Sequence, residues 1–254
     1  MKTTIYYFSA TGNSMTTAQK LAQRLGGCEA VPVASVMNLN KIVDDSDAVG
    51  FVFPVYYGNM AYPMRQAVSK MVLKEGAYVF SVATYRGHAG KAAQRLDQLL
   101  RTRGQKLSLA LGVPMPGNSF INAPEVDQGH LDNQNAAVDA LVARILAREA
   151  QDYFTDELLP ITPVGYPNNF RGIEAEPDKC TGCGACTWVC PMNNIAIVDG
   201  KARIGDDCST CLACFHWCPN EAIWMSRQEN IARRSKYHHP DVRLEDIVAQ
   251  KNPE

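Results

Sequence analysis

The sequence predicts a doubly wound α/β domain followed by a small α+β domain that is rich in cysteine. Over residues 1–150, short apolar runs take turns with stretches of helical periodicity. The runs contain almost no polar positions, which is typical of parallel strands that are buried on both faces and connected by crossover helices. Eight of the nine cysteines then lie between Cys180 and Cys218. A hydrophobic fraction of 46% excludes a disordered chain.

The expected elements follow from local composition. Residues 3–8 are β-branched and aromatic, and Ala18, Leu21 and Leu25 recur at the spacing of one helix face. By the same patterns, strands are expected at 48–53, 77–83 and 107–113, and helices at 13–25, 62–73, 89–103 and 134–149. We therefore assign residues 1–150 to the α/β domain.

Three further segments follow this domain. Pro160, Pro163 and Pro167 indicate a semi-rigid linker over residues 151–175. The cysteine-rich domain is expected at 176–225, and a polar extension at 226–254. Within the extension, Tyr237-His238-His239-Pro240 is expected to form a surface turn and not a metal site, because adjacent histidines point in different directions on most backbones.

Charge separates the two halves of the chain. Residues 1–150 carry 15 Lys and Arg against 11 Asp and Glu, whereas residues 151–254 carry 10 against 15. These opposite net charges predict that the halves dock on each other. The sequence shows neither an apolar run of the ~18 residues that cross a bilayer nor a signal-peptide core at its start. We expect a cytoplasmic protein with no membrane insertion and no nucleic-acid partner, and the sequence indicates no particular oligomeric state.

The cysteines form two copies of the spacing C-x2-C-x2-C-x3-C-P, the first beginning at Cys180 and the second at Cys208. Three thiolates spaced by two residues suit one [4Fe-4S] cluster, and the fourth cysteine, which precedes a proline, ligates the other cluster. The expected ligands are Cys180, Cys183, Cys186 and Cys218 for one cluster and Cys208, Cys211, Cys214 and Cys190 for the other.

A disulfide framework and a zinc site are the two alternatives to clusters. A disulfide framework needs an oxidising compartment, which the lack of a signal-peptide core argues against. Zinc usually takes two CxxC pairs that are separated by a longer loop, and it does not need a third cysteine two residues further on. Residues 176–225 resemble bacterial two-cluster ferredoxins, and the likeness includes Pro191 and Pro219 after the last cysteine of each copy. Cys28 lies outside the motif and is expected to be a small core or surface residue.

The loop after the first strand, Ser9-Ala10-Thr11-Gly12-Asn13-Ser14, contains neither GxGxxG nor the Gly-Lys-Ser/Thr of a P-loop. Its hydroxyls and the backbone N–H groups of a helix N-terminus suit a phosphate monoester held without Lys or Arg. A turn with a helix N-cap is the simpler alternative. The loop resembles the S/T-x-T-G-x-S/T pattern of the flavodoxin family, which implies FMN as cofactor and the phosphate ligands Ser9, Thr11, Gly12, Asn13 and Ser14.

Flavin sites of this fold occur at the carboxyl ends of the strands. The flavodoxin resemblance implies ring contacts in the loops after the third and fourth strands, namely Pro54, Tyr56, Tyr57, Gly58 and Asn59, then Thr84, Tyr85, Arg86, Gly87 and Gly90. Aromatic faces would stack on the ring, and an arginine would stabilise anionic reduced flavin. In the alternative, the tyrosines pack against helices while Arg86 and His88 are solvated. A third loop, 114–120, is expected to cover the site.

The whole chain resembles the flavodoxin–ferredoxin fusion proteins of anaerobic bacteria and archaea. The resemblance implies a flavodoxin-like doubly wound five-stranded parallel sheet and a small C-terminal α+β ferredoxin domain with two [4Fe-4S] clusters. We expect an electron-transfer protein that passes electrons between its clusters, FMN and a partner redox protein. One alternative is an FMN-dependent reductase of a small substrate, fed by the clusters. Another is a protein whose clusters sense iron or oxygen.

Overall fold

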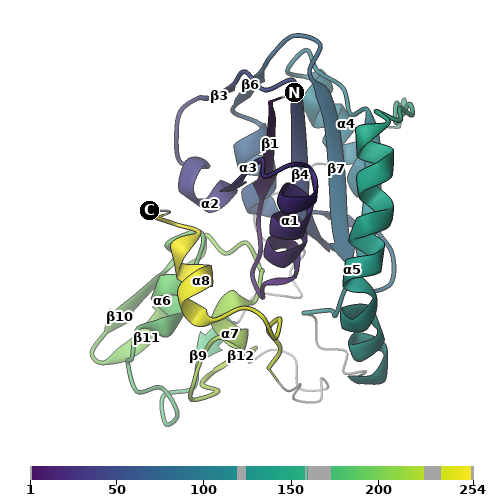
Figure 1. Ribbon diagram of the computed structural model, residues 1–254. Helices are drawn as coiled ribbons and strands as arrows, with labels where there is room; N and C mark the ends of the chain where they lie inside the picture. The colour runs from purple at the N-terminus through teal and green to yellow at the C-terminus, as the bar shows by residue number, and fades with distance from the viewer. Residues whose placement is uncertain (1, 119–123, 158, 160–172, 226–235, 253–254) are drawn as a thin grey trace.

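The computed structural model describes residues 2–118, 124–157, 159, 173–225 and 236–252. A large sheet with helices on both faces forms one part, and a smaller part lies beyond the carboxyl ends of its strands (Figure 1). Most of the expected linker, at 158 and 160–172, and residues 119–120 of the third loop lie outside the described residues. Within the described part of the chain, every helix is too short or too polar to cross a bilayer.

The large part is the predicted doubly wound sheet of five parallel strands. Its strands run in the order β2-β1-β4-β7-β8, and a short β5 pairs antiparallel with β4. They are β1 (Thr3–Tyr7), β2 (Glu29–Pro32), β4 (Ala48–Tyr56), β5 (Asn59–Met60), β7 (Tyr78–Tyr85) and β8 (Leu109–Pro114). Helices α1 (Asn13–Arg24) and α5 (Pro124–Leu146) cover one face, and α2 (Val33–Val36), α3 (Tyr62–Val68) and α4 (Ala92–Arg101) cover the other (Figure 1).

Three elements differ from the sequence prediction. The helix expected at 62–73 ends at Val68, because Met71–Leu73 forms a strand, β6, that pairs with β3 (Ile42–Asp44). Helix α5 begins at Pro124 and not near residue 134, since its first turns are too polar to show a periodic apolar face. Strand β8 is an edge strand, so its residues are alternately buried and half-buried.

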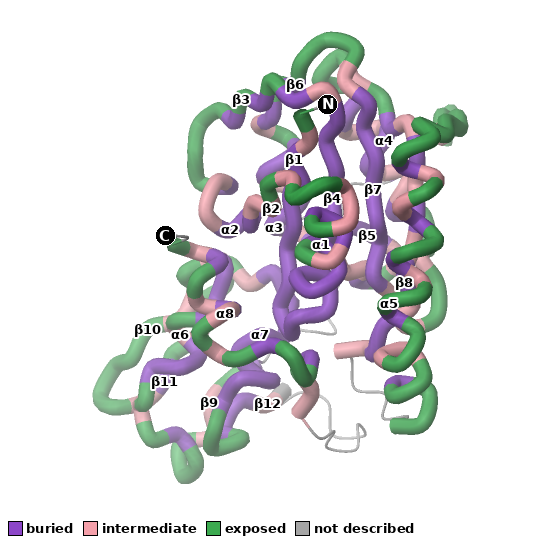
Figure 2. The backbone as a smooth tube through the Cα atoms, in the orientation of Figure 1, coloured by how far each residue is buried: buried purple, intermediate pink, exposed green. Residues whose placement is uncertain are grey.

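The core of the sheet lies around its central strands. Phe51 and Phe80, on neighbouring strands β4 and β7, are fully buried. Gly50 makes room for the Phe80 ring, because a Cβ at Gly50 would lie 2.4 Å from Phe80 Cζ. Figure 2 shows these central strands as buried over most of their length.

The small part combines short helices with two-stranded sheets. Strands β9 (Ile173–Ala175) and β12 (Ile223–Met225) pair antiparallel, as do β10 (Ile195–Val198) and β11 (Lys201–Ile204). Its helices are α6 (Ala185–Val189), α7 (Ala213–His216) and, in the C-terminal extension, α8 (Leu244–Ala249). Cys211, Trp217 and Val242 belong to the same buried cluster as the core of the sheet. The two parts therefore pack through a shared buried cluster, and the small part also has a core cluster of its own.

Candidate functional site

A cavity of about 270 Å³ opens at the carboxyl ends of the parallel strands, where the two parts of the chain meet. Its lining comes from the loops that follow β1, β4, β7 and β8, and from the cysteine-rich part. The lining residues are Ser9, Ala10, Thr11, Asn13, Ser14, Pro54, Val55, Tyr56, Tyr57, Thr84, Tyr85, Arg86, Met115, Pro116, Gly117, Asn118, Thr210 and Leu212.

The loop 9–14 forms one end of this cavity. Gly12, the N-cap of α1, has φ +100°, a conformation that glycine adopts freely. Its N–H donates to Ser9 Oγ at 3.0 Å, and the hydroxyls of Ser14 and Thr84 are 2.7 Å apart. The first N–H groups of α1 have no partner within the helix and carry its positive dipole end. This arrangement fits a phosphate group that is held by hydroxyls and backbone N–H groups.

Asn13 positions the loop against its neighbours. Its Nδ2 donates to the Pro116 carbonyl at 2.8 Å, and its Oδ1 accepts from the Tyr237 hydroxyl at 2.6 Å. Because both ends of the amide are engaged, the side chain ties the loop after β1 to the loop after β8 and to the C-terminal extension.

Aromatic side chains lie along the other end of the cavity. Tyr57 is 49% exposed and has φ 53°, so part of its ring faces open space beside the cavity. Tyr56 is buried, and its hydroxyl accepts from Asn118 Nδ2 at 3.0 Å. Arg86 Nε lies 3.1 Å from Asp127 Oδ1, and this ion pair offsets the arginine charge. The cavity therefore offers an aromatic surface for a planar ring.

Five of the predicted flavin contacts lie outside the lining: Gly12, Gly58, Asn59, Gly87 and Gly90. The Gly58 carbonyl accepts from Lys91 N and from Arg95 Nη1, both at 3.1 Å. Gly90 touches the same residue, because a Cβ at Gly90 would lie 2.4 Å from Gly58 Cα. Gly90 is therefore needed where the two backbone segments touch.

The eight cysteines of the repeat form two groups in space. Burial, followed by the nearby thiols of Cys218, Cys180 and Cys183, raises the pKa of Cys186 to about 11. The pKa of Cys214 is raised by burial and then by the thiols of Cys211, Cys208 and Cys190. We call Cys180, Cys183, Cys186 and Cys218 the outer group, and Cys190, Cys208, Cys211 and Cys214 the inner group. The fourth thiol of each group thus comes from the other copy of the repeat.

The surroundings of these sulfurs fit iron–sulfur clusters. Backbone N–H groups donate to sulfur in both groups: Ala202 N to Cys180 Sγ and Ala222 N to Cys218 Sγ at 3.3 Å, Thr210 N to Cys208 Sγ at 3.3 Å, and Asn194 N to Cys190 Sγ at 3.4 Å. Such bonds favour the thiolate form and help to set the potential of a bound cluster. Iron would in turn offset the cost of burying thiolates.

Comparison with known proteins agrees with both halves of this site. A family model described as a flavodoxin domain matches residues 4–116. A second, described as a 4Fe-4S dicluster domain, matches residues 172–219. The chain belongs to the flavodoxin–ferredoxin fusion proteins. A ferredoxin of Methanothermococcus thermolithotrophicus is 40% identical over 55 residues, which are 20% of this fusion protein and 92% of that ferredoxin.

Solved structures are also similar to the fusion protein. A flavoprotein from Bacteroides eggerthii is 18% identical, with a TM-score of 0.37, over 52% of this chain and 96% of that one. A flavodoxin from Streptococcus pneumonia TIGR4 is 18% identical, with a TM-score of 0.34, over 56% of this chain and 100% of that one. Together the two matched domains make the fusion protein an electron-transfer protein with FMN and [4Fe-4S] clusters as cofactors.

Sequence analysis did not identify Ala10, Thr210 or Leu212 as lining residues. The last two lie inside the cysteine repeat, far along the chain from the phosphate loop. One signal was present: when the two copies of the repeat are aligned on their cysteines, Thr210 and Leu212 replace Gly182 and Gly184 of the first copy.

Proposed function

We propose that this fusion protein carries electrons between a partner redox protein and FMN, with the outer and inner cysteine groups in series. Thr210 and Leu212 flank Cys211 and line the flavin cavity. Asn118 Nδ2 donates both to the Tyr56 hydroxyl and to the Cys211 carbonyl, each at 3.0 Å. This junction between the flavin cavity and the inner group is the observation that carries the proposal.

The outer group reaches the surface of the protein. Cys183 is the exposed member of the eight, and Trp188 beside it is 50% exposed. Ile197, which borders the same small hollow as Cys183, is also partly exposed. An exposed sulfur with an apolar rim suits contact with a partner protein, whereas buried Cys211 and Cys214 are shielded from solvent.

Each part of the chain has a separate task in this proposal. When bound, FMN exchanges one or two electrons, and each cluster exchanges one. Ser9, Thr11 and Ser14 hold the phosphate, and Tyr57 supports the ring. Three members of the inner group, Cys190, Cys211 and Cys214, are buried, so that electrons from the outer group are directed to the flavin.

Anaerobic stopped-flow spectroscopy tests whether the outer group, the inner group and FMN exchange electrons in series. The reconstituted protein is reduced with dithionite, a one-electron reductant, and then mixed with an oxidised acceptor protein. We expect the FMN band and the cluster band to respond in sequence within one chain, at a rate independent of protein concentration. The proposal fails if the clusters are reoxidised while FMN stays reduced. Rapid reduction of a small quinone with no partner protein present would instead favour the reductase.

A further inference from the structure

We infer that the C-terminal segment 236–252 positions the phosphate loop 9–14 for FMN binding, because it forms hydrogen bonds with this loop and packs against it without lining the cavity. This segment lies outside both matched domains, which cover residues 4–116 and 172–219. The inference rests on the proposed binding of the FMN phosphate at that loop. It assigns the segment a positioning role, since no residue of the segment lines the cavity.

Hydrogen bonds from the segment reach the loop at three residues. Gln250 forms a pair of bonds with Ser9: its Nε2 donates to the Ser9 carbonyl at 2.9 Å, and its Oε1 accepts from Ser9 N at 3.1 Å. His239 N donates to the Thr11 carbonyl at 2.8 Å. The Tyr237 hydroxyl donates to Asn13 Oδ1 at 2.6 Å. None of these bonds uses the hydroxyls of Ser9, Thr11 or Ser14, so the segment holds the loop without occupying the side chains that the proposal assigns to the phosphate.

Close packing accompanies these bonds. A Cβ at Gly12 would lie 2.8 Å from Val242 Cγ2 and 2.9 Å from His239 Cβ. Gly12 is therefore needed for two reasons: its φ of +100° and the segment that presses against it. Val242 and His239 are 3% and 2% exposed, so this contact is part of the core.

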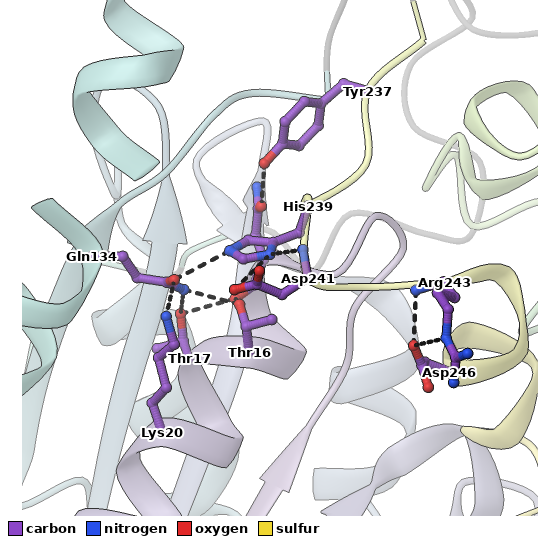
Figure 3. A network of polar contacts seen from close by, with 10 residues as sticks. Thr16, Thr17, Lys20, Gln134, Tyr237, His239, Asp241, Arg243 and Asp246 are labelled. Atoms are coloured by element: carbon purple, nitrogen blue, oxygen red, sulfur yellow. Dashed lines mark hydrogen bonds and ion pairs between the residues drawn. The ribbon is translucent and has the colours of Figure 1, made fainter. Parts of the chain in front are cut away.

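The His239 side chain extends the contact to two helices. Figure 3 shows its imidazole pointing at Gln134 of α5. Its Nε2 donates to Gln134 Oε1 at 3.1 Å, and Gln134 Nε2 donates to the hydroxyls of Thr16 and Thr17 in the first turns of α1. Lys20 Nζ also donates to Gln134 Oε1, at 2.7 Å. The helix end that would face the phosphate is thereby tied to α5 and to the segment.

The same segment contacts the cysteine-rich part. Tyr237 N donates to His216 Nδ1 at 3.0 Å, and the His238 ring stacks on Trp217 at 4.4 Å. Trp217 Nε1 in turn donates to the carbonyl of Ala10, inside the phosphate loop, at 2.9 Å. The segment therefore links the position of the loop to the position of the inner cysteine group.

The test measures dissociation constants for FMN and for riboflavin, by quenching of flavin fluorescence, in the full-length protein with its clusters reconstituted. The variants are Tyr237→Phe, which removes one hydroxyl, and Gln250→Ala, which removes the bonds to Ser9. Glu245→Gln is the control, since Glu245 is an exposed residue of the same segment. Iron content confirms that each variant is assembled.

We expect FMN affinity to fall about threefold to tenfold in each variant, the usual effect of one or two hydrogen bonds. Riboflavin affinity should stay within twofold of wild type, because riboflavin has no phosphate. Equal losses for both flavins, or no loss of FMN affinity, would overturn the inference. The proposed phosphate site is judged separately on the wild type, where FMN must bind more tightly than riboflavin.

Discussion

The two copies of the cysteine repeat share a positive φ at two aligned positions, where glycine in the first copy is replaced by larger residues in the second. Gly182 and Gly184 of the first copy have φ of +70° and +84°. Their counterparts in the second copy, Thr210 and Leu212, have φ of 52° and 61°. Positive φ is open to glycine and costs other residues roughly 1–2 kcal/mol. The second copy thus accepts strain that the first copy avoids.

The surroundings of the two copies explain this difference. In the first copy, a Cβ at Gly182 would lie 2.4 Å from the Gly200 carbonyl oxygen, so no side chain fits. In the second copy, Thr210 and Leu212 are 7% and 6% exposed and line the flavin cavity. Strained residues gather where a site needs their side chains. We conclude that the second copy accepts this strain where its side chains line the cavity.

Among the tests of this comparison, the substitution Cys190→Ala has the largest expected effect. Cys190 belongs to the first copy in sequence and to the inner group in space, so its loss should reduce iron from about eight to about four per chain. Adding Cys208→Ala should cost no more iron, whereas adding Cys183→Ala should remove both clusters. Cys28→Ala is the control, because Cys28 lies outside both groups, and should keep about eight iron. Iron and sulfide assays with EPR report the outcome; equal iron in the two double variants would contradict the grouping.

Glycine-to-alanine changes in the first copy give the next largest effect. Gly182→Ala should lower the free energy of unfolding by roughly 4 kcal/mol, since positive φ and a clash with the Gly200 backbone act together. Gly184→Ala should cost about 1 kcal/mol, because its Cβ would meet only Trp188, at an ordinary 3.5 Å. Denaturant unfolding of the anaerobic protein measures both. Similar costs at the two positions would show that the clash is relieved by movement of the Gly200 turn.

The sequence predicts features that depend on residues close together in the chain, but not features that depend on contacts between residues far apart in the chain. The cysteine repeat and the loop 9–14 are local patterns, and both led to the right domains. The position of strand β2 was not predicted, since Glu29–Pro32 is only four residues long and ends at a proline. The expected surface turn at Tyr237–Pro240 is only partly present: His238 and Pro240 are exposed and Val242 N donates to the His239 carbonyl at 3.0 Å, but His239 is 2% exposed because it packs against the loop 9–14, near the other end of the chain. No local pattern reports such a contact.

Low pH should lower the free energy of unfolding through the protonation of His239. Burial, with a smaller effect of the Lys20 charge, lowers the pKa of His239 to about 4, although the Asp241 carboxylate acts in the opposite direction. Protonation would also remove the Nδ1 acceptor of the Asp241 N–H, at 3.2 Å. Between pH 6.5 and 4 the unfolded chain binds this proton and the folded chain does not, so stability falls as pH falls, by about 3 kcal/mol in all.

Unfolding curves at several pH values, in wild type and in His239→Gln, measure this contribution as the difference in slope. His88→Gln is the matched control, because His88 is exposed, and it should keep the wild-type slope. The assignment fails if His239→Gln and wild type lose stability in parallel over this range.

The smallest expected effect is that of salt on the rates of electron transfer at the two cysteine groups. The opposite charges of the two halves predict docking through exposed charges, which are screened over a Debye length of ~10 Å at 0.1 M salt. The contacts described between the halves are of another kind: Trp217 is buried and donates a hydrogen bond to the Ala10 carbonyl, and Cys211 and Ala213 lie in the shared buried cluster.

Electron transfer from the inner group to FMN should therefore change less than about twofold between roughly 0.05 and 0.5 M salt. Exchange between the outer group and a charged partner occurs at an exposed surface, so its rate should change severalfold over the same range. Stopped-flow traces at the FMN band, with and without the partner, measure both steps in one protein. If the internal step slows in parallel with the partner step, the halves dock transiently through surface charge, and the buried junction at Asn118 and Cys211 does not control transfer.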